Sequence, residues 1–462
     1  MGKDLPSKYI KPRWPFLQCD KRGYMVIDGV PIRDIIKKHG TPIYVMVESE
    51  IRRRMQMFKH GIPYPKVKIQ YASKCNSNLE ILRIAKEEGL EQDASSTGEI
   101  ILGLMAGFKP EQINYTNLYK TEQDVLFAAK IGVNSVSADS VEELRMIAKV
   151  CKSIKHHIKI ALRINPMIDV GSYTSRKLKY GIPHHYAKRA IDFVKKSPYM
   201  QLVGLHFHGG YISNPKIYEE AAKKLLNLAK YCESIGVKLK FIDLGGGFPI
   251  KHTNREVFTV QDFGPKFAEF FRKQLEVMGL PMYTLIFEPG KAIVGNAGIG
   301  LTTVVSSKRV SRRNFLVVDA STYAFVPDPL ICDWYYEILP ASDLKRRRST
   351  VYDIGGSTCD AWDIIGTNRW LPTMSAGENL AIMDCGAYSS VLASNFNTLK
   401  KASMVMVWKD GTFSLIRRRD RYSEMFAPEL DVLREPKPKE LKSLYNTYRV
   451  DIQKFWGNKK KK

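Results

Sequence analysis

The chain has 462 residues, 44% hydrophobic and 26% charged, so it is long enough for one large and one smaller domain with separate cores. It contains no apolar run of about 18 residues, which argues against a membrane span, and its N-terminus lacks the apolar core of a signal peptide. Seven cysteines without paired spacing predict a reducing, cytoplasmic setting and no structural metal site.

The net charge of +25 comes from short basic clusters spread along the chain. They lie at residues 52–54, 152–159, 345–348, 417–421 and 459–462. None of them alternates with aromatic residues as in a nucleic-acid-binding module, so nucleic acid is not the expected partner. A generally basic surface is the simpler interpretation, and an acidic protein partner is the alternative.

The first 40 residues are β-prone and irregular and end in a short helical pattern at Gly40. A regular alternation of strands and helices follows over residues 41–300, after a first strand at 41–47. The strands are predicted at residues 67–71, 90–94, 112–116, 135–138, 158–164, 202–207, 240–244 and 284–287. Eight strands that alternate with amphipathic helices are typical of a (β/α)8 barrel, an α/β fold.

The pattern changes after Gly300, where short β-prone runs are joined by turns. These runs lie at residues 301–307, 313–318, 351–354, 380–383, 403–408 and 412–417. They predict a second, all-β domain over residues 301–430, which also takes in the segment 1–40. Residues 431–462 are predicted to form a basic tail, helical from Pro436 and frayed at its end.

Lys74 lies where a predicted barrel strand ends and a helical pattern begins. This edge of a parallel barrel is where catalytic groups are placed. A lysine there can be desolvated and able to form a Schiff base, although the segment taken alone is also compatible with a solvated loop lysine.

Three other strand ends carry polar groups. Gly245–Gly247 follow strand seven and let backbone N–H groups approach an anion such as phosphate, although three glycines also fit a tight turn. Glu288 and Lys291 follow strand eight. His206 and His208 end strand six and share one face, but no further ligand has the spacing of a metal site, so no metal is expected.

A lysine, a glycine-rich loop, an inward histidine and a glutamate at one barrel mouth fit one cofactor, pyridoxal 5′-phosphate. The lysine forms the covalent link and the glycines hold the phosphate. The carboxylate keeps the pyridine nitrogen protonated, so that the ring accepts electrons.

The chain resembles the fold-type III pyridoxal-phosphate decarboxylases, the group of diaminopimelate and ornithine decarboxylases, from about Gly23 to Phe426. The motifs that carry the resemblance are Tyr71–Lys74, Asp93–Glu99, Gly204–Gly210, Gly245–Gly247, Glu288–Gly290, Cys359–Asp363 and Gly386–Tyr388. The resemblance implies a carboxy-lyase that acts on a small amino acid. It also implies a cytoplasmic homodimer whose sites are shared across the subunit interface.

The resemblance also assigns roles to single residues. Lys74 would hold the cofactor, Glu288 would pair with the pyridine nitrogen and His208 would stack on the ring. Cys359 of the second subunit would protonate the carbon that has lost carbon dioxide. The full set implied for the cofactor is Lys74, Asp93, Arg163, His208, Gly246, Gly247, Glu288, Gly290, Lys291 and Tyr388.

Several positions depart from the family pattern. Lys291 replaces the usual arginine, and Tyr211 stands where a phosphate-binding serine is expected. Asp328 lies nearest to the arginine that grips the distal carboxylate in diaminopimelate decarboxylases. Asp360 follows the catalytic cysteine as in ornithine decarboxylases, whose second amine ligand is missing here in the stretch Asp319–Ser321.

Other motifs look like the diaminopimelate branch: Asn296–Gly298, Ser394–Asn397 and Leu415–Arg419. The sequence therefore predicts a diaminopimelate-decarboxylase-like enzyme with an altered distal pocket, whose substrate contacts come from Asp360, Asp328, Lys291 and Tyr388. The alternatives are a decarboxylase of ornithine, lysine or arginine, or of a carrier-tethered amino acid. A non-catalytic, partner-binding paralogue and a racemase are further alternatives, which the intact Lys74, Glu288 and Cys359 disfavour.

Overall fold

The computed structural model describes residues 13–252, 257–332 and 334–432. The chain folds into two compact units. One comprises residues 50–296, and the other comprises the residues up to 49 together with those from 297 onward. The predicted helix from Pro436 lies outside the described residues.

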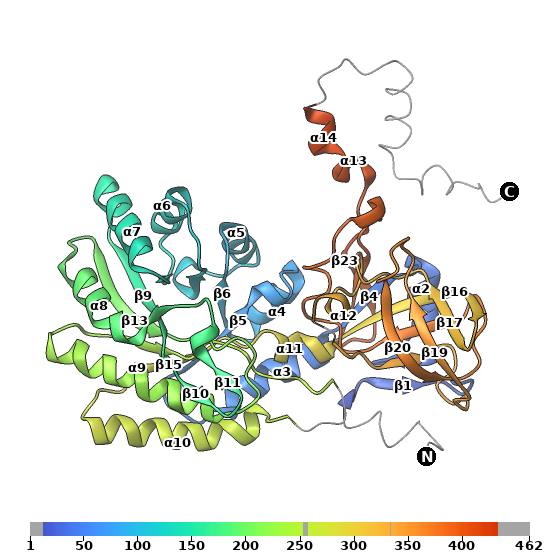
Figure 1. Ribbon diagram of the computed structural model, residues 1–462, viewed down its shortest axis with the longest axis horizontal. Helices are drawn as coiled ribbons and strands as arrows, with labels where there is room; N and C mark the ends of the chain where they lie inside the picture. The colour runs from blue at the N-terminus through green and yellow to red at the C-terminus, as the bar shows by residue number, and fades with distance from the viewer. Residues whose placement is uncertain (1–12, 253–256, 333, 433–462) are drawn as a thin grey trace. The chain divides into compact units, whose positions relative to one another are not determined.

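The first unit is a closed barrel of eight parallel strands (Figure 1). Its strands are β5 (Val67–Ala72), β6 (Glu91–Ala94), β7 (Ile113–Thr116), β8 (Ser135–Ala138), β9 (Ile158–Asn165), β13 (Met200–His206), β14 (Phe241–Asp243) and β15 (Thr284–Phe287). The order β9-β13-β14-β15-β5-β6-β7-β8 is closed by pairing of β8 with β9. The predicted barrel is therefore confirmed, and each strand lies within two residues of its expected position.

Helices surround the barrel because each has one apolar face and a defined start. They are α3 (Glu48–Gly61), α4 (Leu79–Glu87), α5 (Thr97–Met105), α6 (Glu122–Ile131), α7 (Val141–Ile154), α8 (Ala187–Lys196), α9 (Lys216–Ser234), α10 (Val260–Met278) and the short α11 (Lys291–Val294). In α4, for example, the Asn78 side chain accepts a hydrogen bond from Glu80 N–H, and Ile81, Leu82 and Ile84 are buried.

The connection after β9 is longer than the others. It contains the hairpin of β10 (Asp169–Val170) and β11 (Tyr173–Thr174). The short strand β12 (Ile182–Pro183) follows and pairs with the carboxyl end of β9. This connection brings the side chain of Tyr173 to the loop that follows β13. If Gly209 in that loop had a Cβ atom, it would lie 2.9 Å from the Tyr173 hydroxyl.

The second unit is rich in strands. Its main sheet has the order β20-β19-β17-β16-β4-β22-β23. The strands are β4 (Ile43–Val47), β16 (Gly298–Val310), β17 (Arg313–Val318), β18 (Ile338–Pro340), β19 (Thr350–Gly355), β20 (Ile364–Leu371), β21 (Asn379–Ile382), β22 (Ser403–Val407) and β23 (Phe413–Arg417), with β1 (Leu17–Cys19), β2 (Met25–Ile27) and β3 (Val30–Pro31) in a small separate sheet. The short helices of this unit are α2 (Ile32–His39), α12 (Asp328–Cys332), α13 (Tyr422–Met425) and α14 (Ala427–Asp431).

The N-terminal segment packs into the core of this second unit. Trp14, Phe16 and Met25 share a hydrophobic cluster with Leu301 and Val405. The barrel unit begins at residue 50 and not at residue 41, because β4 belongs to the second unit, where it pairs with β16 and β22 and all five of its residues are buried.

After Gly300, two strands of this unit were absent from the predicted set. β18 has only three residues, too few for a periodic pattern. β20 contains Thr367, Asn368 and Arg369, which interrupt its apolar residues.

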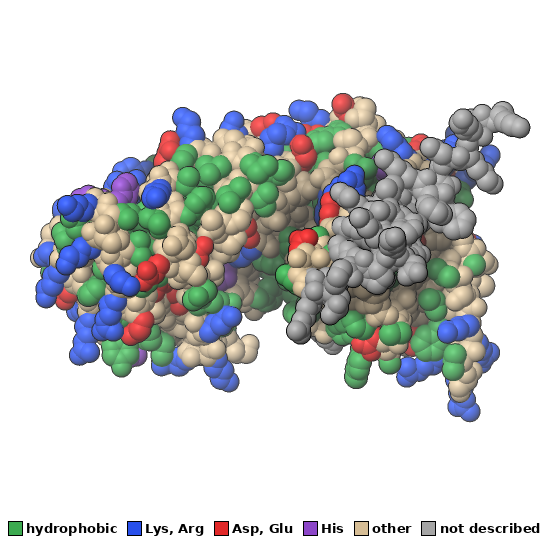
Figure 2. Space-filling view, turned by 90° about the horizontal axis from the view of Figure 1, so that it is seen from above, with side chains coloured by type: hydrophobic (Ala, Val, Ile, Leu, Met, Phe, Trp, Pro, Cys, Tyr) green, Lys and Arg blue, Asp and Glu red, His purple; other side chains and the backbone are tan. Residues whose placement is uncertain are grey.

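The basic clusters are partly neutralised by acidic neighbours. Arg52 pairs with Glu87 and Glu88 at 2.7 and 2.6 Å, and Arg346 pairs with Glu378 at 2.7 Å. Figure 2 shows lysine and arginine side chains scattered over the visible face among acidic and apolar ones. On this face the basic side chains are interspersed with acidic and apolar ones. Among the described residues, no helix is both long and apolar enough to cross a membrane.

Candidate active site

Lys74 and Asp93 meet at the carboxyl ends of two neighbouring barrel strands. Lys74 lies in a short 3-10 turn, η1 (Ser73–Cys75), directly after β5, and Asp93 lies in β6 beside Ala72. Lys74 Nζ is 2.6 Å from Asp93 Oδ2, and Asp93 is fully buried. The other oxygen, Asp93 Oδ1, is buried with no hydrogen-bonding partner among the residues that the structure describes. A carboxylate thus anchors the lysine amine at the barrel mouth.

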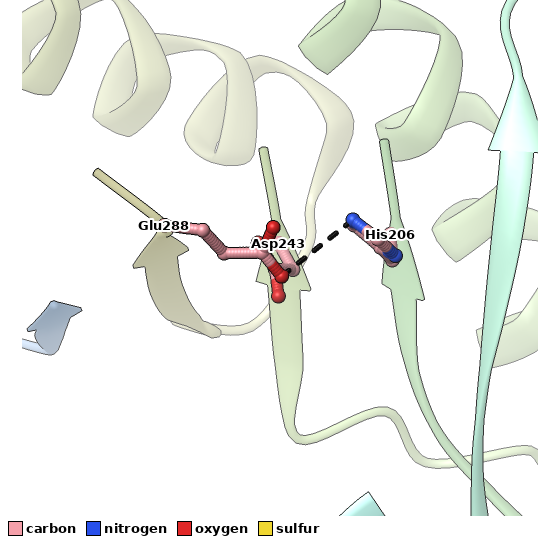
Figure 3. A group of neighbouring side chains, drawn as sticks. All are labelled: His206, Asp243 and Glu288. Atoms are coloured by element: carbon pink, nitrogen blue, oxygen red, sulfur yellow. Dashed lines mark ion pairs between the residues drawn. The ribbon is translucent and has the colours of Figure 1, made fainter. Parts of the chain in front are cut away.

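Three further strand ends bring His206, Asp243 and Glu288 together (Figure 3). His206 ends β13, Asp243 ends β14 and Glu288 follows β15. Their ligand-type atoms all lie within 4.8 Å of one another, and His206 Nε2 is 3.7 Å from Glu288 Oε1. All three side chains are buried, and His206 Nδ1 lies 2.9 Å from Ser137 Oγ, which fixes the ring.

Burial pushes these groups toward their uncharged forms. Desolvation, reinforced by Asp243 and Asp93, raises the pKa of Glu288 well above its ordinary value. Desolvation likewise raises the pKa of Asp243 to about 7. Desolvation and the charge of Arg163 lower the pKa of His206 well below its ordinary value. The His206 imidazole is therefore neutral.

The cluster leaves polar atoms for a bound group to satisfy. In the described part of the chain, neither Glu288 oxygen nor His206 Nε2 makes a hydrogen bond of normal geometry. Buried polar atoms are rarely left in this state, so a donor such as a protonated pyridine nitrogen fits beside Glu288.

The same three side chains form a plausible ligand set for a metal ion, which spacing along the sequence did not reveal. No third ligand has metal-site spacing along the chain, whereas the pairing of β13, β14 and β15 brings Asp243 and Glu288 to His206. The charges of Lys74 and Arg163 act on Glu288, but those of Asp243 and Asp93 act on it more strongly. The buried Glu288 oxygens have no hydrogen-bonding partner among the described residues, and an organic group that donates a hydrogen bond would satisfy them.

His208 lies beyond His206 and is held by an aromatic and ionic network. Its ring makes an edge contact with Tyr180, with centroids 5.4 Å apart, and the Arg163 guanidinium lies 4.6 Å from the Tyr180 ring centre. Arg163 Nη1 is 3.4 Å from Asp139 Oδ1, which also accepts a hydrogen bond from Gly181 N–H. Burial and the Arg163 charge lower the pKa of His208 well below its ordinary value. A neutral, immobilised ring of this kind is suited to stacking.

The loop after β14 has no room for side chains. Gly245 and Gly247 have φ values of 67° and 99°, in the left-handed region. A Cβ on Gly246 would lie 2.3 Å from the carbonyl oxygen of Glu288, so this glycine is required by close approach of two backbones. The Tyr218 hydroxyl, from helix α9, donates a hydrogen bond to Gly246 O at 2.9 Å and so holds the loop in place.

The turn after β15 is equally tight. A Cβ on Gly290 would lie 2.9 Å from Cys75 Sγ and 3.1 Å from Ala72 O, which packs this turn against the residues around Lys74. Lys291 begins α11. Lys74, Glu288 and Gly290 therefore belong to one compact region of the barrel mouth.

One polar group in this region was not identified from the sequence. The Tyr173 hydroxyl is buried with no hydrogen-bonding partner among the described residues, and it lies beside Gly209. Tyr211, which replaces the expected serine, is 50% exposed. No periodic or spacing signal marks Tyr173, because only the long connection after β9 brings it here.

The second unit carries the remaining predicted site residues. Cys359 is an exposed free thiol, and its Sγ accepts a hydrogen bond from Asn397 Nδ2 at 3.1 Å. Asp360 accepts hydrogen bonds from the Tyr323 hydroxyl and from Trp362 N–H, the latter at 3.1 Å. The Tyr323 hydrogen bond lowers the pKa of Asp360, so this carboxylate is charged.

Two further predicted residues of this unit have distinctive surroundings. Tyr388 has a φ of 57°, a strained conformation for a tyrosine and one that often marks a functional site. Asp328 is buried, and it accepts a hydrogen bond from the Tyr336 hydroxyl at 2.9 Å. Neither Tyr323 nor Asn397 was predicted as a site residue, since each meets its partner only through the folded loops.

Known proteins with similar sequences belong to one family of decarboxylases. Residues 48–295 match the family model described as pyridoxal-dependent decarboxylase, pyridoxal binding domain. A diaminopimelate decarboxylase of Methanothermobacter thermautotrophicus is 31% identical over 422 residues, which cover 89% of this chain and 97% of that protein. A diaminopimelate decarboxylase of Aquifex aeolicus is 30% identical over 425 residues, which cover 90% and 98% of the two chains.

Solved structures show the same fold. The diaminopimelate decarboxylase of M. jannaschii in complex with L-lysine superposes with a TM-score of 0.84 at 26% identity, covering 92% of this chain and 98% of that one. A lysine/ornithine decarboxylase of Vibrio vulnificus in complex with putrescine superposes with a TM-score of 0.72 at 23% identity, covering 81% and 96%.

Proposed function

Because the chain belongs to the pyridoxal-dependent decarboxylase family, we propose that it decarboxylates an amino acid with a free distal amine and that its distal pocket no longer suits meso-diaminopimelate. Membership of the family makes the protein a pyridoxal-phosphate-dependent amino-acid decarboxylase. The proposal concerns the substrate and the roles of single residues. The charged Asp360 next to Cys359 is the observation that carries it.

The residues of the barrel mouth fit the cofactor. Lys74 supplies the amine for its covalent attachment. The buried oxygens of Glu288 have no hydrogen-bonding partner among the described residues, so they can accept a hydrogen bond from the cofactor. His208 offers a flat neutral face, and we assign the phosphate to the tight loop that contains Gly246 and Gly247. We assign to Tyr173 the hydroxyl that the expected serine would provide to the phosphate. When bound, the cofactor accepts the electrons released from the bond to the leaving carboxylate.

The protein's own groups then have distinct tasks. Asp93 orients the Lys74 amine, and the network of Arg163 and Tyr180 holds the His208 ring in place. Cys359 gives its thiol proton to the α-carbon after carbon dioxide has left. Lys291 and Tyr388 are assigned to the cofactor and substrate by the family pattern.

The substrate proposal rests on charge. Among the described residues, no lysine or arginine forms an ion pair with Asp360, which accepts hydrogen bonds from the Tyr323 hydroxyl and Trp362 N–H. A charged carboxylate of this kind suits an ammonium group at the distal end of a substrate.

A second distal carboxylate, as in meso-diaminopimelate, needs a cationic partner. Burying it unpaired costs several kcal/mol. Asp328 stands near the position of the usual arginine and would add repulsion rather than attraction. Lys291 carries only a point charge where the family has a bidentate arginine.

The test is a screen of carbon dioxide release. Purified enzyme with pyridoxal phosphate is supplied with meso-diaminopimelate, lysine, ornithine, arginine and carrier-linked amino acids. We expect turnover of a substrate with a free distal amine and weak or no turnover of meso-diaminopimelate. Lys74→Ala serves as the control and should release nothing.

Efficient and selective decarboxylation of meso-diaminopimelate would refute the altered pocket while leaving the cofactor chemistry intact. Selective turnover of a carrier-linked substrate would instead identify the acidic carrier as the partner of the basic surface.

A further inference from the structure

A strained turn holds Asn397 against Cys359. Asn397 and Thr398, in the 3-10 turn η6 (Phe396–Thr398), both have a φ of 54°. Asparagine tolerates this left-handed region, but a β-branched threonine there is a real outlier that the surrounding structure has to enforce. Backbone strain of this kind is typically retained where it positions a side chain that has a function.

The turn is clamped on both sides by hydrogen bonds. Asn395 Nδ2 donates to Leu399 O at 2.8 Å and to Asp420 Oδ2 at 3.1 Å. Asp420 also accepts from Lys401 N–H at 3.1 Å and pairs with Arg417 at 2.7 Å. These hydrogen bonds connect two of the sequence motifs that resemble the diaminopimelate branch, Ser394–Asn397 and Leu415–Arg419. Both motifs therefore help to hold the turn that contains Asn397.

The clamped turn also packs against the residue that contacts Asp360. The Phe396 ring lies 4.4 Å from the Tyr323 ring, and Ser394 N–H donates to Tyr323 O at 2.8 Å. Cys359, Asp360, Tyr323 and Asn397 therefore form one pre-arranged group within the second unit.

We propose that Asn397 is a positioning residue for Cys359, whose amide N–H orients the thiol and stabilises the thiolate that remains after proton transfer. The inference rests on the proposed role of Cys359 as proton donor. In that step the S–H bond breaks and a C–H bond forms at the carbon that has lost carbon dioxide. The carbon supplies the electron pair of the new bond, the S–H electron pair stays on sulfur, and water later returns the proton.

The hydrogen bond from Asn397 to Cys359 counteracts a repulsion between two negative charges. The charged Asp360 is the next residue in the chain, and a like charge opposes formation of a thiolate. A hydrogen bond from Asn397 to the sulfur, at 3.1 Å, offsets this repulsion because it is stronger to an anion than to a neutral thiol.

The test is the pH dependence of thiol alkylation, which requires no turnover. Cys332 and Cys359 are the two exposed cysteines, so a Cys332→Ser background is treated with iodoacetamide, and mass spectrometry follows the peptide of Cys359. Asn397→Gly removes the amide but tolerates the left-handed φ. The matched control is Asn368→Gly, which removes an asparagine of almost the same φ, 53°, from β20, where its pairing with β19 is irregular.

We expect Asn397→Gly to move the midpoint of the alkylation profile upward by about one pH unit, and Asn397→Asp to move it further, while Asn368→Gly leaves it in place. An unchanged midpoint in Asn397→Gly overturns the proposal, and so does an equal shift in Asn368→Gly. If the midpoint shifts as expected but no amino acid is decarboxylated, the contact stands and the proposed function fails.

Discussion

Asp243 and Glu288 are two buried carboxyl groups that share one site, so the stability of the cofactor-free protein depends on their protonation. Burial raises the pKa of Asp243 to about 7, whereas an aspartate in an unfolded chain titrates near 4. Between these values the folded state binds a proton that the unfolded state has lost. The stabilisation is complete below about pH 4 and disappears as the pH rises through about 7.

We therefore expect the cofactor-free protein to lose about 2 kcal/mol more of its free energy of unfolding between pH 5 and pH 7 than the variant Asp243→Asn, which cannot titrate there. Urea unfolding at both pH values measures this difference. The exposed Asp34→Asn is the control and should keep the wild-type pH dependence. If the wild type and Asp243→Asn lose the same free energy of unfolding between pH 5 and pH 7, Asp243 is not the group that causes the pH dependence.

Tyr173 supports a second prediction about a single residue. If its buried hydroxyl donates to the cofactor's phosphate, Tyr173→Phe should weaken binding of pyridoxal phosphate about tenfold or more, because a hydrogen bond to a charged group is lost. Binding of pyridoxal, which lacks the phosphate, should not change. Equilibrium dialysis with absorbance detection measures both affinities without any need for turnover.

Tyr211→Phe is the matched control, because Tyr211 stands at the position of the expected serine and is 50% exposed. We expect it to bind both compounds as the wild type does. An equal loss for pyridoxal phosphate and pyridoxal in Tyr173→Phe would reassign Tyr173 to packing of the loop, and a selective loss in Tyr211→Phe would return the phosphate contact to that residue.

Among the elements, the loop after β14 is the one whose packing decides the shape of the site. Gly246→Ala places a Cβ 2.3 Å from the backbone oxygen of Glu288, which cannot move without displacing β15. We expect a loss of at least about 2 kcal/mol in the free energy of unfolding, measured by urea titration.

The comparison is a glycine in a helix of the same barrel. Gly98→Ala in α5 meets its nearest neighbour, Ser96 Oγ, at an ordinary 3.6 Å, and alanine favours a helix over glycine. This variant should be as stable as the wild type or slightly more so. Similar effects of the two substitutions would mean that the loop relaxes more easily than its contacts indicate.

At the scale of the whole molecule, we propose that active sites are shared between two subunits. Lys74 belongs to the barrel unit, whereas Cys359 and Asp360 belong to the other unit and are far away in sequence. The family pattern places the cysteine on the second subunit of a homodimer.

Mixing Lys74→Ala with Cys359→Ala subunits should therefore restore activity from two inactive proteins, since each hybrid dimer contains one intact site. With random exchange of equal amounts, about half of the dimers are hybrids, and up to about a quarter of wild-type activity is expected. Activity is measured by carbon dioxide release after mass spectrometry has confirmed exchange. No recovery despite exchange would place each site within one chain.

The sequence by itself determined the barrel and its chemistry. Strand and helix periodicities are local properties, and the eight strands alternate regularly with helices, so the fold could be predicted without any knowledge of contacts. Lys74, His208 and Glu288 were predicted as site residues from their places at the ends of such strands, together with the resemblance to the decarboxylase family. The β-rich unit was predicted less completely, since β18 is too short and β20 too polar to show a pattern.

The tertiary structure alone decided which side chains meet. His206, Asp243 and Glu288 end or follow three different strands, and the pairing of β13 with β14 and of β14 with β15 brings them within 4.8 Å. Tyr173 reaches Gly209 through an irregular connection, and Asn397 meets Cys359 across 38 residues. Such contacts depend on strand register and on strained loops, which are set by the balance of packing over the whole unit and leave no periodic trace in the chain.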